Sequence, residues 1–303
     1  MDHFKHIAIV ANTHISQVQH SVEQLAALLL GRSIEVLLEA ETAKRLGMVD
    51  LPVMQESDLQ NKIDLVIVVG GDGSMLAAAR HLVDYQVPLM GINRGRLGFL
   101  NDILPADIER DVTLVLQGDF IESTRFLLDV EIKRDQQLIG TGNALNDVVL
   151  HPGKSVRMME FELTIDGKFV YSQRSDGLIV STPTGSTAYA LSGGGPILHP
   201  GLDAIGLVPM NPHTLTSRPI VVSGNSSIEI LVGARNELHP FFTCDGQEYI
   251  KTEPGDIIHI RKKNRLLRLI HPPGHNFYET CRSKLGWGSR LDFSRDTDMR
   301  EDG

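Results

Sequence analysis

The chain has 303 residues, of which 42% are hydrophobic and 22% charged, so it can bury a sizeable core and is unlike a disordered protein. With 29 basic and 38 acidic residues its formal net charge is −9, which argues against nucleic acid or an anionic membrane surface as the main partner. Two distant cysteines, no secretory leader and no apolar run of the ~20 residues that span a bilayer predict a reduced, cytoplasmic protein.

Strand and helix patterns alternate in the first third of the chain. Helical spacing of apolar residues follows the first apolar run, with Ser16 as a candidate N-cap and Gly31 at the end, and a second helix is expected at 74–82. This order predicts an open, mostly parallel α/β sheet with right-handed crossovers. The expected strands, short apolar runs typical of parallel sheets, are residues 7–11, 34–38, 65–69 and 87–92.

The rest of the chain is rich in β-forming residues. After an expected helix at 106–116, turn residues separate short segments at intervals typical of a β-sandwich. We therefore expect an α/β domain over 1–120 and a β-rich domain over 121–275, with residues 276–291 returning to the first domain and 292–303 forming a flexible tail. The expected strands are 126–132, 137–139, 147–150, 161–165, 177–181, 220–222, 227–232, 257–260 and 266–270.

Residues 70–74, Gly-Gly-Asp-Gly-Ser, lie between a buried strand and the start of a helix. Glycines there let the backbone approach phosphate, and helix N–H groups supply donors, so Gly70, Gly71, Gly73 and Ser74 predict a phosphate loop. Asp72 is a candidate general base toward a substrate hydroxyl. The alternative is a plain turn in which Asp72 caps the helix. The loop matches neither a Walker A motif nor the dinucleotide fingerprint.

Three further polar clusters are candidates for ligand contacts. A second glycine loop at 91–100 carries Arg94 and Arg96, which match phosphate geometry or are surface residues of a solvated turn. Residues 182–189 combine four hydroxyls with a glycine before a short helical turn, a composition that suits ribose or phosphate recognition or a capped turn. Asn146-Asp147 can hold two neighbouring ribose hydroxyls. We find no metal-ligand spacing among the histidines.

Taken in chain order, these motifs resemble those of the ATP-dependent NAD kinases, in particular the bacterial branch. The resemblance runs from about residue 5 to residue 287, and it implies an α/β domain, a β-rich domain and an NAD site between them that a neighbouring subunit often completes. Many relatives carry Asn-Glu where this chain has Asn146-Asp147, whose acid is shorter. The motifs are Gly-Gly-Asp-Gly at 70–73, Gly-Phe-Leu at 98–100, Asn-Asp at 146–147, Asp-Gly at 176–177 and Thr-Pro-Thr-Gly-Ser-Thr-Ala-Tyr at 182–189.

The resemblance also implies a reaction, in which the γ-phosphoryl group of ATP passes to the 2′-hydroxyl of the adenosine ribose of NAD with Asp72 as general base. It implies a divalent ion, Mg²⁺ above all, and a homodimer or homotetramer without nucleic acid or membrane partners. The residues that it assigns to the NAD site are Asp72, Gly73, Asn146, Asp147, Arg157, Arg174, Asp176, Thr187, Ala188, Tyr189, Ala190, Leu191, Ser192 and Gln247.

Two other functions are compatible with parts of this pattern. A lipid or sugar kinase would share the Gly-Gly-Asp-Gly loop but would leave Asn146-Asp147 and the hydroxyl-rich loop unexplained. A non-catalytic NAD sensor would bind NAD without forming NADP. Mg-ATP, NAD and an NADP-specific assay distinguish the three.

Overall fold

A computed structural model describes residues 2–11, 18–48, 50–94, 98–153, 155, 157–237 and 239–288. The candidate cap Ser16, the arginine Arg96 and the expected tail at 292–303 lie outside these ranges. Among the described residues, no helix is both long enough and apolar enough to cross a membrane.

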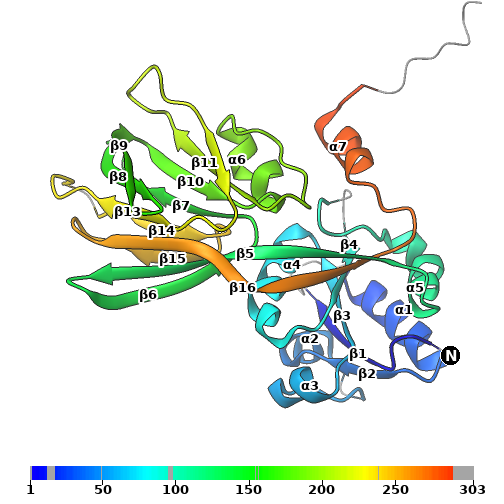
Figure 1. Ribbon diagram of the computed structural model, residues 1–303. Helices are drawn as coiled ribbons and strands as arrows, with labels where there is room; N and C mark the ends of the chain where they lie inside the picture. The colour runs from blue at the N-terminus through cyan, green and yellow to red at the C-terminus, as the bar shows by residue number, and fades with distance from the viewer. Residues whose placement is uncertain are drawn as a thin grey trace, which may run out of the picture.

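The first third of the chain forms the predicted parallel sheet, in the order β2-β1-β3-β4 (Figure 1). Two short helices, α2 and α3, were not expected, because they are too short to show a clear apolar period. The strands are β1 (His6–Ala11), β2 (Glu35–Leu38), β3 (Leu65–Gly70) and β4 (Leu89–Asn93). The helices are α1 (Val18–Gly31), α2 (Ala40–Leu46), α3 (Glu56–Asn61), α4 (Asp72–Leu82) and α5 (Ile108–Leu116), with 3₁₀ turns η1 (Val83–Tyr85) and η2 (Pro105–Asp107).

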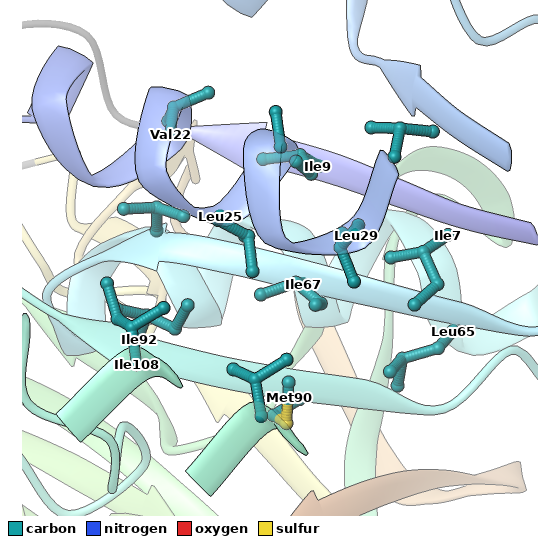
Figure 2. Packing of buried hydrophobic residues seen from close by; sticks show 14 of the residues in the cluster. Ile7, Ile9, Val22, Leu25, Leu29, Leu65, Ile67, Met90, Ile92 and Ile108 are labelled. Carbon is teal, nitrogen blue, oxygen red and sulfur yellow. The ribbon is translucent and has the colours of Figure 1, made fainter. Parts of the chain in front are cut away.

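Alternate residues of these strands pack on opposite faces of the sheet. Ile7, Ile67 and Ile92 belong to a cluster that α1 and α5 cover. Figure 2 shows Leu25 and Leu29 of α1 packed on this face of the sheet. Ala8, Val66 and Val68 belong to a second cluster that α4 covers on the other side. Because both faces are covered, the strands are apolar throughout, and this is the signal from which they were predicted.

The second half is β-rich, as expected, and consists mainly of antiparallel strands. A six-stranded sheet, β12-β11-β10-β7-β14-β15, packs its apolar residues against strands of the larger sheet, and the two share one buried core. The strands are β5 (Ile121–Arg134), β6 (Gln137–Ala144), β7 (Asp147–His151), β8 (Met159–Ile165), β9 (Lys168–Ser175), β10 (Gly177–Ser181), β11 (Ala204–Met210), β12 (Ile220–Ser223), β13 (Ile228–Val232), β14 (Phe241–Cys244), β15 (Glu248–Lys251) and β16 (Ile257–His271). The short η3 (Thr184–Thr187) and α6 (Tyr189–Ser192) follow β10.

The long strand β16 joins the two halves. It pairs in parallel with β4 at Leu269 and Leu89, and antiparallel with β5 and β13, so a ten-stranded sheet runs through both halves (Figure 1). We expected two strands here, 257–260 and 266–270, because the charged residues between them break the apolar alternation. The chain remains one strand because β5 pairs with it on both sides of a register shift between Lys262 and Leu266. The division into domains at residue 120 stays a prediction.

The described chain ends in helix α7 (Phe277–Leu285). Asn276 caps it, accepting hydrogen bonds from the N–H groups of Tyr278 and Glu279. The rings of Phe277 and Tyr278 contact His199, which follows α6 in the chain. The helix therefore lies against the segment that carries the hydroxyl-rich loop.

Candidate active site

The glycine loop lies at the carboxyl end of β3, where open α/β sheets bind ligands (Figure 1). Asp72 is the first residue of α4, and within the described chain its carboxylate accepts hydrogen bonds from Phe99 N–H at 2.9 Å and Leu100 N–H at 3.2 Å. A Cβ atom on Gly98 would lie 1.9 Å from Asp72 Oδ1, so only glycine lets the two segments approach this closely. Asp72 thus connects the two glycine loops instead of capping its own helix.

Asn146 and Asp147 lie on the β-rich side of the site, where β7 begins. The carboxylate of Asp245, which is fully buried, accepts hydrogen bonds from the N–H groups of Leu145, Asn146 and Asp147 at 2.8–3.2 Å. Burial, and then the negative charge of Asp245, raise the pKa of Asp147 to about 7, against a hydrogen bond from the Tyr189 backbone. Asp147 therefore titrates near neutral pH, and it costs free energy to keep it ionised.

The hydroxyl-rich loop packs directly against this segment. Thr182 N–H donates to Asn146 C=O at 2.9 Å, and a Cβ atom on Gly185 would lie 2.0 Å from the same oxygen. The hydroxyls of Thr182, Ser186 and Thr187 donate to main-chain carbonyls of Leu145, Pro183 and Thr184. These hydroxyl contacts stabilise the conformation of the loop. The loop residues that line the neighbouring cavity are Ala188 and Tyr189, whose side chain is exposed.

Two side chains join the glycine loop to the β-rich side. Gln247 Nε2 donates to Gly73 C=O at 2.8 Å. Arg80, on α4, is 9% exposed; its Nη1 donates to Asp245 Oδ2 at 3.2 Å and its Nη2 to Gln247 Oε1 at 3.0 Å. Asp245 in turn holds the main chain of Asn146 and Asp147, so one set of contacts links the helix of Asp72 to that pair.

Two cavities flank this junction. The first, of about 700 Å³, lies on the β-rich side. The second, of about 540 Å³, lies at the carboxyl end of β1 and along α4. The first is lined by Asn146, Asp147, Val149, His151, Pro152, Gly153, Ser155, Asp176, Ala188, Tyr189, Met210, Thr243, Asp245, Gly246 and Tyr249. The second is lined by Val10, Ala11, Glu39, Glu41, Arg45, Met54, Gly73, Ser74, Ala77, Ala78, His81, Leu82 and Gln247.

The predicted residues divide between these cavities and their surroundings. Asn146, Asp147, Asp176, Ala188 and Tyr189 line the first cavity, and Gly73, Ser74 and Gln247 line the second. Asp72 lies between the two glycine loops, and Gly70 and Gly71 are the end of β3 and the N-cap of α4. The predicted residues of η3 and α6 that line neither cavity are Thr187, Ala190, Leu191 and Ser192.

The predicted arginines are not part of either cavity lining. Arg157 is 68% exposed and forms an ion pair with Glu237, and Arg174 is exposed on β9. Arg94, which we considered for phosphate, donates to Ser21 on α1 at 2.8 Å. The roles of Arg157 and Arg174 stay predictions.

Arg80 and Asp245 were not predicted. Asp245-Gly246 forms an ordinary turn dipeptide between β14 and β15, and Arg80 is an arginine in the last turn of a helix, where basic residues are common. Arg80 and Asp245 are 165 residues apart in the sequence, so no local pattern predicts their contact.

Comparison with known proteins gives a consistent result. Residues 7–120 match the model of the ATP-NAD kinase N-terminal domain, and residues 145–272 match that of the ATP-NAD kinase C-terminal domain. The chain is 57% identical to the NAD kinase of Teredinibacter turnerae over 95% of its own length and 99% of the relative's. It is 56% identical to that of Azotobacter vinelandii over 96% and 99%.

Solved structures show the same fold. The yeast NADH kinase complexed with NADH superposes with a TM-score of 0.85 at 23% identity, covering 96% of this chain and 90% of that one. An NAD kinase from Archaeoglobus fulgidus in complex with ATP superposes with a TM-score of 0.69 at 25% identity, covering 93% of this chain and 100% of that one.

Proposed function

The chain belongs to the ATP-NAD kinase family, and we propose that it transfers the γ-phosphoryl group of ATP to the 2′-hydroxyl of the adenosine ribose of NAD, forming ADP and NADP. The observation that carries this proposal is the junction between the two cavities. The carboxylate-bearing glycine loop and the Asn146-Asp147 pair belong to different halves of the chain, and Arg80 and Gln247 link them. An acceptor on one side and a donor on the other can then react across the junction.

In this proposal the first cavity binds NAD. Its volume of about 700 Å³ lies in the range of cofactor sites. Asn146 offers an amide and Asp147 a carboxylate at the cavity wall, and such a pair can bond both hydroxyls of a ribose. Tyr189 offers an aromatic face for the adenine ring. We propose that Thr187, Ala190, Leu191 and Ser192 support this side and that Asp176, in the cavity wall, contacts NAD. Arg157 and Arg174 line neither cavity, and we propose them as NAD contacts on the resemblance alone.

Asp72 is the general base in this mechanism. An ionised carboxylate has about four acceptor positions, and N–H groups of the described residues occupy two of those on Asp72. These donors fix the orientation of the carboxylate while leaving acceptor capacity for the 2′-hydroxyl. The oxygen attacks the γ-phosphorus as its proton passes to Asp72, and the bond between the γ-phosphorus and the bridging oxygen breaks to release ADP. Such a base contributes typically ~10²–10⁴-fold to the rate.

The second cavity is the proposed site of the ATP phosphates. Gly73 and Ser74 line it at the start of α4, where backbone N–H groups are available to an anion. The Ser74 hydroxyl is buried and has no hydrogen-bond partner among the residues that the structure describes. A ligand oxygen in this cavity would provide one.

The same cavity fits a divalent ion. The carboxylate of Glu39 and the hydroxyl of Ser74 are hard oxygen donors of the kind that Mg²⁺ prefers, and Mg²⁺ commonly uses one or two protein carboxylates together with phosphate oxygens. When bound, the ion would neutralise charge on the phosphates. The residues of this chain would hold the nucleotide and orient the reacting groups.

We also propose a homodimer or homotetramer in the cytoplasm. Tyr249, at the edge of the first cavity, is 64% exposed, and Leu215 is 92% exposed. Contact with a second copy would bury both side chains. Light scattering of the purified protein measures the mass directly.

The proposal is tested by NADP formation. Purified protein is incubated with Mg-ATP and NAD, and the product is measured with a dehydrogenase that uses only NADP. We expect NADP to form with NAD and no phosphorylation of a diacylglycerol or a hexose phosphate. Binding of NAD without NADP formation would instead identify an NAD sensor, and phosphorylation of the other acceptors would identify a lipid or sugar kinase.

A further inference from the structure

Three ionisable side chains gather behind the second glycine loop: Asp102, His271 and His275. The Nδ1 atoms of both histidines contact the same oxygen, Asp102 Oδ2, and for His275 the distance is 3.2 Å. The side chains are 12%, 2% and 16% exposed in that order. The two imidazole rings stack with centroids 3.9 Å apart and planes inclined by 17°. This cluster is not among the residues assigned to the reaction.

The ligand atoms of the cluster lie within 4.8 Å of one another, a separation that could suit a metal ion. The guanidinium of Arg125, which is half-buried beside Asp102, disfavours a cation at this place.

The contacts are those of a hydrogen-bonded cluster instead. Burial tends to raise the pKa of Asp102, but the hydrogen bonds from His271 and His275 hold it at about 2, so this carboxylate is ionised. Burial lowers the pKa of His271. A neutral His271 donates from Nδ1 to Asp102 and accepts the Ser123 hydroxyl at Nε2, 2.7 Å away.

Asp102 is separated by only one residue from the backbone that holds Asp72. The segment 99–102 makes a contact with the first glycine loop at almost every residue: Phe99 and Leu100 donate to the Asp72 carboxylate, and Asn101 Nδ2 donates to Gly70 C=O at 3.1 Å. Asp102 then joins the segment to the end of β16 and to the residue before the cap of α7. A shift at Asp102 is therefore passed directly to the donors of Asp72.

We propose that Asp102, held by His271 and His275, is a positioning residue that keeps the Phe99 and Leu100 N–H groups on the carboxylate of Asp72. The inference rests on the proposed function, because the orientation of Asp72 affects turnover only if Asp72 is the base. Because His275 directly precedes the cap of α7, the position of this last helix would then also affect turnover. Small displacements of a catalytic group can lower the rate substantially.

Two variants test the proposal. Asp102→Asn keeps the shape of the side chain and removes its charge, and His275→Phe keeps a stacked ring and removes its N–H group. The matched control is His6→Phe. His6 Nδ1 also contacts an aspartate oxygen, that of Asp64, at 3.2 Å, but it lies on β1 at the end remote from the glycine loop.

The first readout is hydrogen exchange at the amides of Phe99 and Leu100, measured by NMR without substrates. We expect exchange about tenfold faster or more in Asp102→Asn and His275→Phe, as for the loss of a hydrogen bond to a charged group, and unchanged exchange in His6→Phe. If exchange at these amides is unchanged in both variants, although each lacks one of the contacts within the cluster, the proposal is overturned. If Asp102→Asn fails to fold, His275→Phe still gives the answer.

The second readout is steady-state kinetics. We expect kcat to fall about tenfold or more in both variants with KM for NAD changed less than about threefold, because the NAD cavity is on the other side of the junction. A loss of folded protein would also lower the apparent kcat without changing KM, so kcat is calculated per folded protein, with the folded fraction measured by circular dichroism. Normal kcat despite faster exchange would also overturn the positioning role. Absence of NADP formation by the unaltered enzyme would refute the proposed function but would leave the exchange result valid.

Discussion

From the burial of the Asp147 carboxylate we predict how the free energy of unfolding depends on pH, and this prediction does not depend on catalysis. Its pKa rises from 3.8 to about 7 in the folded protein, because burial and the charge of Asp245 disfavour the ionised form. A shift of about three pH units corresponds to about 4 kcal/mol of folding free energy. The folded pKa is the higher one, so this contribution to stability is fully present below about pH 4 and is lost as the pH rises through about 7.

Asp147→Asn removes the charge and keeps a side-chain oxygen that can accept the hydrogen bond from the Tyr189 backbone. We expect the variant to be more stable than the parent at pH 8.5, by up to about 4 kcal/mol. The advantage should shrink steadily as the pH falls from about 7 toward about 4. Urea unfolding of both proteins at several pH values, without NAD, measures the difference.

Asp176→Asn is the matched control, because Asp176 lines the same cavity but is only half-buried. We expect it to change the free energy of unfolding by less than about 1 kcal/mol at any of these pH values. An Asp147→Asn variant that is less stable than the parent at pH 8.5, or whose advantage does not depend on pH, would refute the reasoning. The expected cost of the stabilised variant is weaker NAD binding.

Two further substitutions examine the junction between the cavities and the contact between the two glycine loops. Arg80→Met leaves the fully buried carboxylate of Asp245 without its cation, so we expect a loss of about 3–5 kcal/mol in urea unfolding, partly recovered by adding Asp245→Asn. Gly98→Ala places a Cβ atom 1.9 Å from Asp72 Oδ1, so we expect kcat to fall about 10²-fold while the Kd for NAD, measured by calorimetry, is retained. Gly31→Ala, which adds a Cβ atom with no neighbour within 4 Å among the described residues, should leave both values near those of the parent.

The sequence predicts the parts of this protein whose signals are local. β3 is apolar throughout because both faces of the sheet are covered, and a glycine loop after such a strand predicts a ligand site at that edge. The predicted fold class, an α/β half followed by a β-rich half, is confirmed for these reasons.

Long-range partners could not be predicted in the same way. Nothing near Asp72 in the sequence indicates that Phe99 and Leu100 hold its carboxylate, and Asp245 reads as an ordinary turn residue until its three N–H donors are seen. The composition of the loop at 182–189 suits ligand recognition or a capped turn and does not decide between them. The hydroxyls of Thr182 and Ser186 donate to main-chain carbonyls, contacts that composition alone does not indicate.

The central claim is that Asp72 removes the proton from the ribose hydroxyl, and Asp72→Asn tests it most directly. Asparagine keeps the size of the side chain but cannot serve as the base, and it has one accepting oxygen where Phe99 and Leu100 donate to the two oxygens of Asp72. With saturating Mg-ATP and NAD we expect kcat for NADP formation to fall by ~10²–10⁴-fold while the Kd for NAD changes less than about threefold. A variant that keeps a near-normal kcat would show that positioning alone drives the transfer and that Asp72 is not the base.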